Sequence, residues 1–484
     1  MSIPGLIALL FAGGLGAGAA GRYDQRLPRW VALGVLALAG AWLAVIWQGG
    51  SVVGLYARTQ VPWIDAFGIS LLLELDGLSL MLVALTLLLG VVAVVSSWAE
   101  TKTREGFFQF NLLWALAGVV GVFTALDLFL FFVFWEVMLI PMYFLIAIWG
   151  HEGRAHAAMK FFLFTQISGL LMLLAMMALV YLHYVNTGVI SFDYYALLEA
   201  DVDPAFELWL MLGFFIAFVV KLPAVPFHSW LPDAHTQAPT AGSVVLAGIL
   251  LKTGGYGLIR FVLPLFPEAV LDFRWPAMAL GAASVIYGGY LAYGQSDFKR
   301  LVAYSSVSHM GFVLLGVFAA NQLALQGAIL QMIAHGFSTA ALFMMAGALQ
   351  QRLHTRDMGA MGGLWVRAPR MGAMALFFIV ASLGMPGLGN FVGEFLVLLG
   401  AFQVDVGLTV AAALGIVVAA VYSLSLMQRA FQGEPGPAAM DDLGARELSV
   451  MVMMMVALVA LGLYPQPVFD LAAPLVTELA GGTP

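Results

Sequence analysis

The sequence predicts an all-α polytopic membrane protein with about 14 transmembrane helices. Of its 484 residues, 62% are hydrophobic and only 10% are charged, which is more apolar surface than a water-soluble domain of this size buries. Apolar runs of about 20 residues, the length that crosses a bilayer, recur along the chain. Lysine and arginine are also divided unevenly between alternate connections, as in chains that cross a membrane repeatedly.

The apolar runs set the approximate bounds of the spans. They cover residues 2–20, 30–48, 77–98, 106–126, 128–149, 158–182, 208–229, 242–263, 276–294, 300–320, 325–349, 372–400, 403–430 and 448–465. No connection is long enough to separate soluble domains, so residues 1–484 are expected to form one membrane-embedded domain. Its expected parts are N-terminal helices (1–105), a first repeat (106–263), a second repeat (276–430) and a C-terminal helix (431–484).

The positions of the basic residues predict the orientation of the spans. Of the 20 lysines and arginines, 15 fall in the odd-numbered connections, two lie inside spans and three fall in the even-numbered connections: Arg58, Arg260 and Arg274. Basic connections stay in the cytoplasm, and an even number of spans places both termini on the opposite side. We therefore expect a multi-pass protein of the bacterial plasma (inner) membrane with both termini in the periplasm.

Composition also excludes several classes of function. The chain has no cysteine, which excludes iron–sulfur clusters, thiolate metal sites, disulfides and covalently attached haem. Its net charge of −7 has the wrong sign for a nucleic-acid-binding surface. Two histidines on neighbouring spans could ligate a haem, but a two-haem cytochrome usually needs four, paired within helices. The expected partner is the lipid bilayer, with no nucleic acid.

Six ionisable side chains lie well inside predicted spans, and they are Glu136, Lys221, Lys252, His309, His335 and Glu394. Each ionised group near a helix centre costs about 2.5–3.5 kcal/mol on insertion scales. One buried pair could be structural, but six groups favour a polar, hydrated track. A buried lysine that loses a carboxylate partner is inclined to release its proton, and histidine titrates near neutral pH. The set therefore predicts a proton path.

Two spans are predicted to be broken. Pro223 and Pro226 follow Lys221, and the stretch "GMPGLGN" precedes Glu394. Proline removes a backbone donor, glycine lowers helix propensity, and non-helical backbone at membrane depth is tolerated only beside protein or a wet cavity. The breaks fall in spans 7 and 12, which predicts two inverted five-helix repeats, helices 4–8 and 9–13.

The segment "HSWLPDAHTQAPTAG", from His228 to Gly242, is predicted to connect spans 7 and 8 on the cytoplasmic side. It carries His228, Asp233 and His235 but no lysine or arginine. Three interpretations stay open. The histidines and the aspartate are suitable metal ligands, although no metal-specific spacing is present. They could instead admit protons, or the segment could be a loop fixed by its prolines.

Four stretches together resemble one family. They are "FWEVMLIPMYFLIAIWG", "KLPAVPFHSWLPDAHTQAPTAGSVVLAGILLKTGGYGLIRF", "SDFKRLVAYSSVSHMGFVLLG" and "GMPGLGNFVGEF", and they run in order from about Glu136 to Glu394. The resemblance is to the M-type antiporter-like subunits of the proton-pumping NADH:quinone oxidoreductase, respiratory complex I, whose mitochondrial counterpart is subunit 4. The broader family includes subunits of multisubunit cation/proton antiporters and of membrane-bound hydrogenases.

The resemblance implies a fold and a role for each buried ionisable residue. The family fold has 14 transmembrane helices with two inverted five-helix repeats and discontinuous helices 7 and 12. The implied roles are a helix-5 glutamate (Glu136) paired with a helix-7 lysine (Lys221), a central relay (Lys252), two histidines that extend the axis (His309 and His335) and a terminal glutamate (Glu394). Related antiporter-like subunits usually carry lysine at this last position, so Glu394 favours the M type.

The resemblance further implies that NADH oxidation and quinone reduction take place in other subunits. This chain is then expected to translocate protons while binding no flavin, cluster, quinone or metal of its own. Its expected partners are other membrane-arm subunits, especially the L-type and N-type antiporter-like subunits. Two alternatives remain open: a subunit of a cation/proton antiporter or membrane-bound hydrogenase with the same track, and a structural scaffold that conducts nothing.

Overall fold

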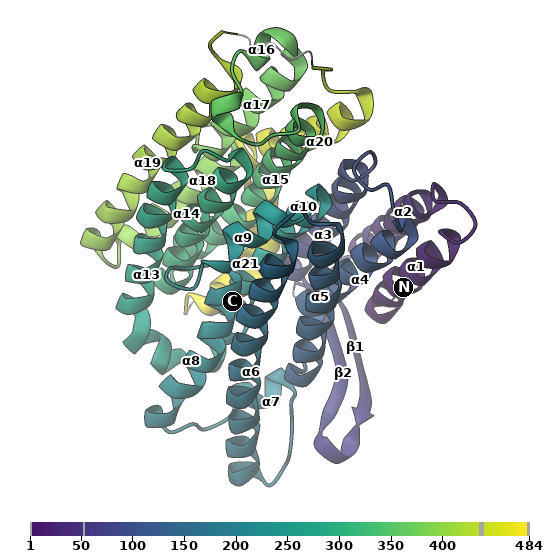
Figure 1. Ribbon diagram of the computed structural model, residues 1–484. Coiled ribbons are helices and arrows are strands. Elements are labelled where there is room, and N and C mark those ends of the chain that lie inside the picture. Colours follow the sequence, from purple (N-terminus) through teal and green to yellow (C-terminus); the bar gives the residue numbers. More distant parts are fainter. Residues whose placement is uncertain (1, 52–53, 435–439, 482–484) are drawn as a thin grey trace.

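The computed structural model describes residues 2–51, 54–434 and 440–481, which form a bundle of long helices with one β-hairpin at its lower end (Figure 1). Within these residues, 13 helices are long and apolar enough to cross a membrane. Twelve carry single labels: α1 (Ile3–Ala20), α2 (Leu27–Gln48), α3 (Gly77–Ser96), α4 (Glu105–Thr124), α5 (Leu128–Trp149), α6 (Arg154–Thr187), α8 (Pro204–Lys221), α13 (Pro267–Tyr293), α14 (Phe298–Ala319), α15 (Gln322–Leu353), α19 (Val406–Phe431) and α20 (Ala445–Leu463).

The thirteenth span, Thr240–Leu265, changes its hydrogen-bonding pattern along its length. It consists of α10 (Thr240–Val245), the π-helical segment η2 (Leu246–Leu250), α11 (Leu251–Gly257), a second π-helical segment η3 (Leu258–Val262) and α12 (Leu263–Leu265). The sequence analysis predicts this span but not its π segments. Such segments widen the helix by one residue per turn and free backbone carbonyls for other donors.

The predicted twelfth span is present as two shorter apolar helices, α17 (Pro369–Ser382) and α18 (Gly389–Phe402). The turn between them contains Gly384 and Gly387, whose φ angles of +81° and +93° are accessible to glycine but rarely to other residues. This pair of helices brings the count to the 14 spans predicted, and the predicted break before Glu394 is confirmed.

The predicted break in the seventh span is also confirmed, because α8 ends at Lys221. The following segment, predicted to connect spans 7 and 8, contains a second helix, α9 (Trp230–Gln237), whose Trp230 and Leu231 are fully buried. Of its three interpretations, the loop fixed by prolines is therefore wrong. Pro232 is tolerated in α9 because it lies in the first turn, where backbone N–H groups have no partner within the helix. The hydroxyl of Thr236 donates to the Pro232 carbonyl (2.6 Å).

The β-hairpin between α2 and α3 is absent from the sequence predictions. Strand β1 (Leu55–Ile64) pairs antiparallel with β2 (Ile69–Asp76), and a short turn, η1 (Asp65–Phe67), joins them. Gly68, with φ +63°, closes the turn. The remaining short elements are α7 (Tyr194–Leu198), η4 (Met358–Ala360), α16 (Leu364–Arg367) and the C-terminal α21 (Gln466–Leu479).

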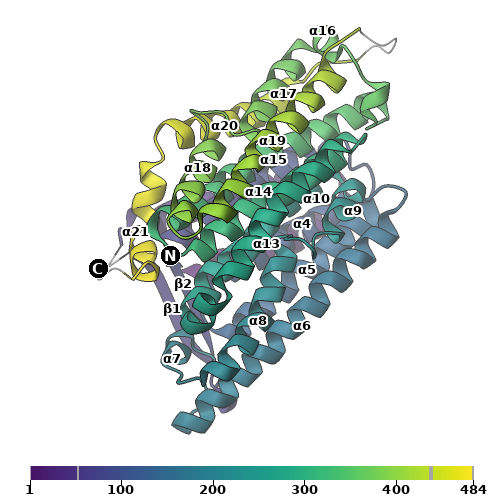
Figure 2. The same cartoon turned by 90° about the vertical axis from the view of Figure 1, so that its left-hand side faces the viewer.

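Ion pairs join several of the basic odd-numbered connections on one side of the bundle. Asp233 binds both Lys160 (2.7 Å) and Arg300 (3.0 Å), and Arg356 binds Asp297 (3.0 Å). The hairpin lies at the other side, where both ends of the described chain also lie (Figure 2). The alternation of sides deduced from the basic residues is therefore reproduced in three dimensions.

The buried side chains of the described residues form one hydrophobic core that extends from α1 to α21. The division into an N-terminal part, two five-helix repeats and a C-terminal part stays a prediction, as does the inverted relation of the repeats. Residues 1, 52–53, 435–439 and 482–484, which belong to the first and last of these parts, lie outside the described residues.

Candidate functional site

Lys252 and His335 form a direct contact in the centre of the bundle. Both side chains are fully buried, and Lys252 Nζ lies 2.7 Å from His335 Nδ1. Lys252 also donates to the backbone carbonyl of Ala247, five residues earlier. Ala247 belongs to the π-helical segment η2, where the register change removes the usual partner of a carbonyl. The π segment thus supplies an acceptor that orients the lysine toward α15.

A second direct contact joins His309 and Glu394, which are 1% and 2% exposed. His309 Nδ1 lies 2.7 Å from Glu394 Oε1, and the same oxygen accepts a hydrogen bond from Gln331 Nε2 (2.8 Å). The other ring nitrogen, Nε2, lies 3.1 Å from Ser382 Oγ and 3.0 Å from the hydroxyl of Tyr422. Both ring nitrogens of His309 therefore have partners.

The two contacts adjoin each other. The imidazole rings of His309 and His335 have centroids 5.6 Å apart, so Lys252, His335, His309 and Glu394 follow one another through the interior. Within the described residues, His335 Nε2 has no hydrogen-bond partner. A buried nitrogen without a partner costs free energy and is a natural position for a bridging water. Four of the six predicted residues thus form one continuous polar chain.

Glu136 of α5 and Lys221 at the end of α8 form a separate pair. Lys221 is fully buried, whereas Glu136 is only partly buried. The two interact electrostatically, but no hydrogen bond joins them, because within the described chain Lys221 Nζ and Glu136 Oε1 have no hydrogen-bond partner. The ammonium instead lies over the rings of Trp135 (5.2 Å) and Phe161 (5.4 Å). The pair is held close without being locked together.

Two glycines bring these groups near their neighbours. A Cβ at Gly169 of α6 would lie 3.0 Å from Glu136 Oε1, so the glycine leaves space for the carboxylate. A Cβ at Gly254, two residues after Lys252, would lie 2.5 Å from the Phe218 carbonyl oxygen and 2.8 Å from the Leu222 backbone nitrogen. The helix carrying Lys252 therefore packs directly on the end of α8 beside Lys221.

His235 is part of the same interior, although the sequence analysis places it in a connection. It is fully buried on α9, and its ring stacks on Phe343 at 4.3 Å. It interacts electrostatically with Lys252 and Lys299, and within the described residues neither ring nitrogen has a hydrogen-bond partner. His235 thus lies between the central lysine and the side of the bundle that carries the basic connections.

Lys299 and Glu100 lie beyond His235 on that side. Lys299 Nζ donates to the Ala238 carbonyl (2.5 Å), and the Glu100 carboxylate accepts from the Thr240 backbone N–H (3.0 Å). Burial raises the pKa of Glu100, an effect that Lys299 and Thr240 oppose. Nearby, burial together with Lys299 and Arg356 lowers the pKa of His151 to about 4. Titratable groups therefore extend from the rim to the centre.

The metal interpretation of the His228–Gly242 segment gains no geometric support. Asp233 is occupied by Lys160 and Arg300, while His235 is buried against an aromatic ring. Within the part of the chain that the structure describes, no group of three or more histidine, aspartate or glutamate side chains is arranged to hold a metal ion.

Three polar residues of this interior, Gln331, Ser382 and Tyr422, were not predicted from the sequence, whereas His235 was named as a possible proton-entry residue but placed in a connection. Only His235 carries a signal in the sequence, since it is titratable. Amides and hydroxyls inside apolar helices are common, and nothing in a local pattern separates these three from other polar residues in the spans.

Three comparisons place this geometry among known proteins. Residues 125–420 match the family described as NADH:quinone oxidoreductase/Mrp antiporter, TM. A relative named NADH-quinone oxidoreductase subunit M from Pseudomonas aeruginosa is 55% identical, over 98% of this chain and 96% of its own.

Chains of two solved structures also resemble this chain in fold. A chain of respiratory complex I from Thermus thermophilus with bound NADH has a TM-score of 0.89 and 31% identity, covering 99% of both chains. A chain of the Mrp complex from Dietzia sp. DQ12-45-1b has a TM-score of 0.85 at 23% identity, over 98% of this chain and 97% of that one. At that identity the second likeness shows the fold alone.

Proposed function

Because the chain belongs to the NADH:quinone oxidoreductase/Mrp antiporter family of membrane subunits, we propose that it is the subunit of a bacterial NADH:quinone oxidoreductase that carries protons along its buried polar axis. The redox chemistry, NADH oxidation and quinone reduction, is assigned to other subunits. This chain supplies ionisable side chains that hold and pass protons, and no cofactor is needed for that role.

One observation carries the proposal: Lys252, His335, His309 and Glu394 are buried and adjacent, with 2.7 Å contacts at both ends of the series. Ionisable groups in a membrane interior are expensive and mark ion or proton pathways. A lysine that donates to one imidazole nitrogen can pass its proton there, and the other nitrogen can release one onward. Within the described residues His335 Nε2 has no hydrogen-bond partner, so it is available for this second step.

The Glu136–Lys221 pair is proposed to control the first transfer. Within the described part of the chain Lys221 Nζ has no hydrogen-bond partner, so its attraction to Glu136 opposes the cost of burying its charge. Moving or neutralising Glu136 makes Lys221 release its proton toward Lys252. Redox energy from the rest of the assembly would act by changing the charge or hydration at this end of the axis.

Proton uptake is proposed to occur from the side with the basic connections, which we assign to the cytoplasm. On that side His235 lies between Lys299 and Lys252, and its two free ring nitrogens suit it to transfer. Release beyond Glu394 then leads to the opposite side. This assignment places the hairpin and both chain termini in the periplasm.

The proposed partners are other membrane-arm subunits, in particular the L-type and N-type antiporter-like subunits. Glu136 supports one such contact, since the residue is only partly buried in this chain, although its Oε1 atom is fully buried beside Gly169 of α6. An ionised group is costly beside lipid, so a polar partner is expected to cover this face.

A test uses the assembled complex in reconstituted vesicles. Lys252→Met removes the central proton carrier while keeping a side chain of similar length, and we expect NADH-driven proton uptake to fall sharply with assembly retained. Undiminished uptake by a fully assembled Lys252→Met complex would refute the proposed path.

The antiporter alternative is separated by co-purification. Recovery of NADH dehydrogenase subunits with this chain supports the present assignment, whereas recovery of antiporter subunits alone would replace it. The near full-length identity of 55% to a subunit M relative favours the former. A structural scaffold predicts that neutralising the six buried ionisable groups stabilises the fold and leaves proton uptake unchanged.

A further inference from the structure

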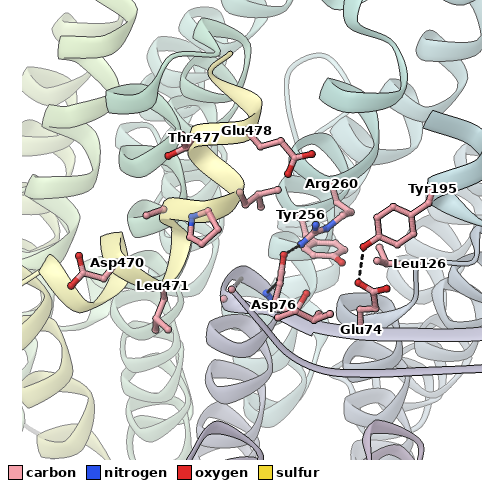
Figure 3. A pocket seen from close by; sticks show the side chains of 17 residues that line it. Glu74, Asp76, Leu126, Tyr195, Tyr256, Arg260, Asp470, Leu471, Thr477 and Glu478 are labelled. Atoms are coloured by element: carbon pink, nitrogen blue, oxygen red, sulfur yellow. Dashed lines mark hydrogen bonds and ion pairs between the residues drawn. The ribbon is translucent and has the colours of Figure 1, made fainter. Parts of the chain in front are cut away.

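A large pocket lies behind the β-hairpin, on the side opposite the basic connections. Its volume is about 810 Å³. Its walls come from the end of β2, the C-terminal helix α21 and the last turns of the Thr240–Leu265 span (Figure 3). The charged residues in its lining are Glu74, Asp76, Arg260, Asp470 and Glu478. A cavity with this lining can hold water.

The inner wall of the pocket lies on the same helix face as the central relay. Tyr256, which lines the pocket, follows Lys252 by four residues within the regular helix α11. Residues four apart in an α-helix lie on one face, with Cβ atoms about 5–6 Å apart. Tyr256 is only 1% exposed, and its hydroxyl interacts with Ser79 and Arg260. One buried phenol thus separates the polar axis from the pocket.

Arg260 lies where a path from Lys252 past Tyr256 would enter the pocket. It is 7% exposed, its guanidinium packs on the Tyr256 ring at 5.5 Å, and it forms an ion pair with Asp76 of the hairpin. Figure 3 shows Glu478 of α21 pointing toward it from the other wall. Asp76 is itself held in place, because its Oδ1 accepts the backbone N–H of Ser79 (2.9 Å) at the start of α3.

A guanidinium is a poor member of a proton-conducting chain. It carries five donors and no acceptor, and it does not lose a proton in proteins. A proton arriving from Tyr256 therefore finds no base at Arg260, and the positive charge repels a hydronium ion in the pocket. Asp76 supplies the counter-charge that makes this buried cation tolerable.

We propose that the Asp76–Arg260 pair closes a second opening of the polar axis, which would otherwise lead from Lys252 past Tyr256 into the pocket behind the hairpin. The pair prevents protons on that side from flowing back through the pocket into the polar axis, which would dissipate the gradient that pumping builds. This inference rests on the proposed function, since a barrier to protons has meaning only where protons pass.

Passive proton permeability tests the barrier separately from pumping. Purified complex in liposomes receives an imposed pH difference without NADH, and its decay is followed with a trapped dye. Arg260→Gln replaces the cation with a neutral amide that both donates and accepts, and we expect the pH difference to decay severalfold faster than in the unaltered complex. Arg260→Lys, which keeps a charge, should restore a slow decay.

Two further variants separate a specific route from general loosening. Adding Tyr256→Phe to Arg260→Gln removes the hydroxyl on the route and should return the decay toward its original rate. Arg58→Gln is the matched control: Arg58 pairs with Glu74 of the same hairpin (3.1 Å), but its side chain is 42% exposed. This control should leave the decay unchanged.

Either of two results overturns the proposal: Arg260→Gln liposomes as tight as the original at equal complex content, or a leak that Tyr256→Phe does not reduce. Undiminished pumping by the Lys252→Met complex would refute the proposed function. That result involves no change in passive leak, so the failure of the function and the failure of the barrier are distinguishable.

If Arg260→Gln does not assemble, the barrier can be tested by cysteine labelling in the otherwise unaltered complex. The chain has no cysteine of its own. A charged thiol reagent added from the hairpin side should modify Thr477→Cys on the pocket wall but not Thr253→Cys, a fully buried position next to Lys252 that does not line the pocket. Equal labelling of both positions would show that the route is open and the barrier absent.

Discussion

Replacing Glu136 with glutamine tests the electrostatic basis of the proposed mechanism. Lys221 is fully buried and has no hydrogen-bond partner within the described chain, so Glu136 is the charge that favours its protonated form. Two unit charges about 4–8 Å apart at an effective dielectric of 20 interact by about 2–4 kcal/mol. Each 1.36 kcal/mol is a tenfold change in a protonation equilibrium constant, so the ratio of protonated to neutral Lys221 should fall about 30- to 900-fold.

The assay compares coupled and uncoupled reactions of the assembled complex in membrane vesicles. NADH:quinone turnover and proton uptake should both fall by about tenfold or more, because a tightly coupled enzyme cannot turn over with a blocked path. Electron transfer from NADH to a soluble artificial acceptor bypasses the membrane path and should stay normal. Glu152→Gln is the matched control, since Glu152 is an exposed glutamate in the connection after α5.

The reasoning is refuted if Glu136→Gln complexes are present at normal levels and pump at the original rate. Glu136→Asp provides a graded check. It keeps the charge but shortens its reach by one methylene, so its activity should lie between those of the original and the glutamine variant.

Three more predictions follow from the surrounding contacts. His335→Leu removes the 2.7 Å acceptor of Lys252; a hydrogen bond to a charged group is worth about 1.5–3 kcal/mol, so proton uptake should fall at least about tenfold, measured per assembled complex. Gly254→Ala places a methyl group 2.5 Å from a backbone oxygen and should lower the melting temperature of the complex, whereas Gly40→Ala, with nothing within 4 Å, should not. The pKa of His151 is lowered to about 4 by burial first and by nearby cations, so the folded state resists protonation. Stability should therefore decrease as the pH falls from 6.5 toward 4, and a thermal melt of His151→Gln should show a smaller decrease.

The membrane architecture was predictable because its determinants are local. Each span needs a run of apolar residues, and each break needs proline or glycine at that point. The breaks after Lys221 and before Glu394 were therefore visible in the sequence and are present in the structure. The alternation of basic connections was equally readable, since it is a count along the chain.

The burial of five of the six predicted ionisable groups, Lys221, Lys252, His309, His335 and Glu394, was also predictable, because a charge in an apolar run is conspicuous. Which of these groups contact one another could not be predicted from the sequence. The sequence orders the lysine, the two histidines and the glutamate along the chain, yet His335 contacts Lys252 while His309 contacts Glu394. That order in space depends on how α14 and α15 pack between the broken helices.

The hairpin, the π-helical segments and the burial of His235 were decided by tertiary structure alone. Strand pairing joins residues that local hydrophobicity does not link, and a π segment differs from an α-helix by a single shifted hydrogen bond. His235 lies between Pro232 and Pro239 in a polar stretch that looks like a connection, but packing of α9 against Phe343 buries it. The sequence by itself determined where the chain crosses the membrane and which charges enter it. The tertiary structure decided which charges meet, because contact depends on helix packing over distances that no local pattern encodes.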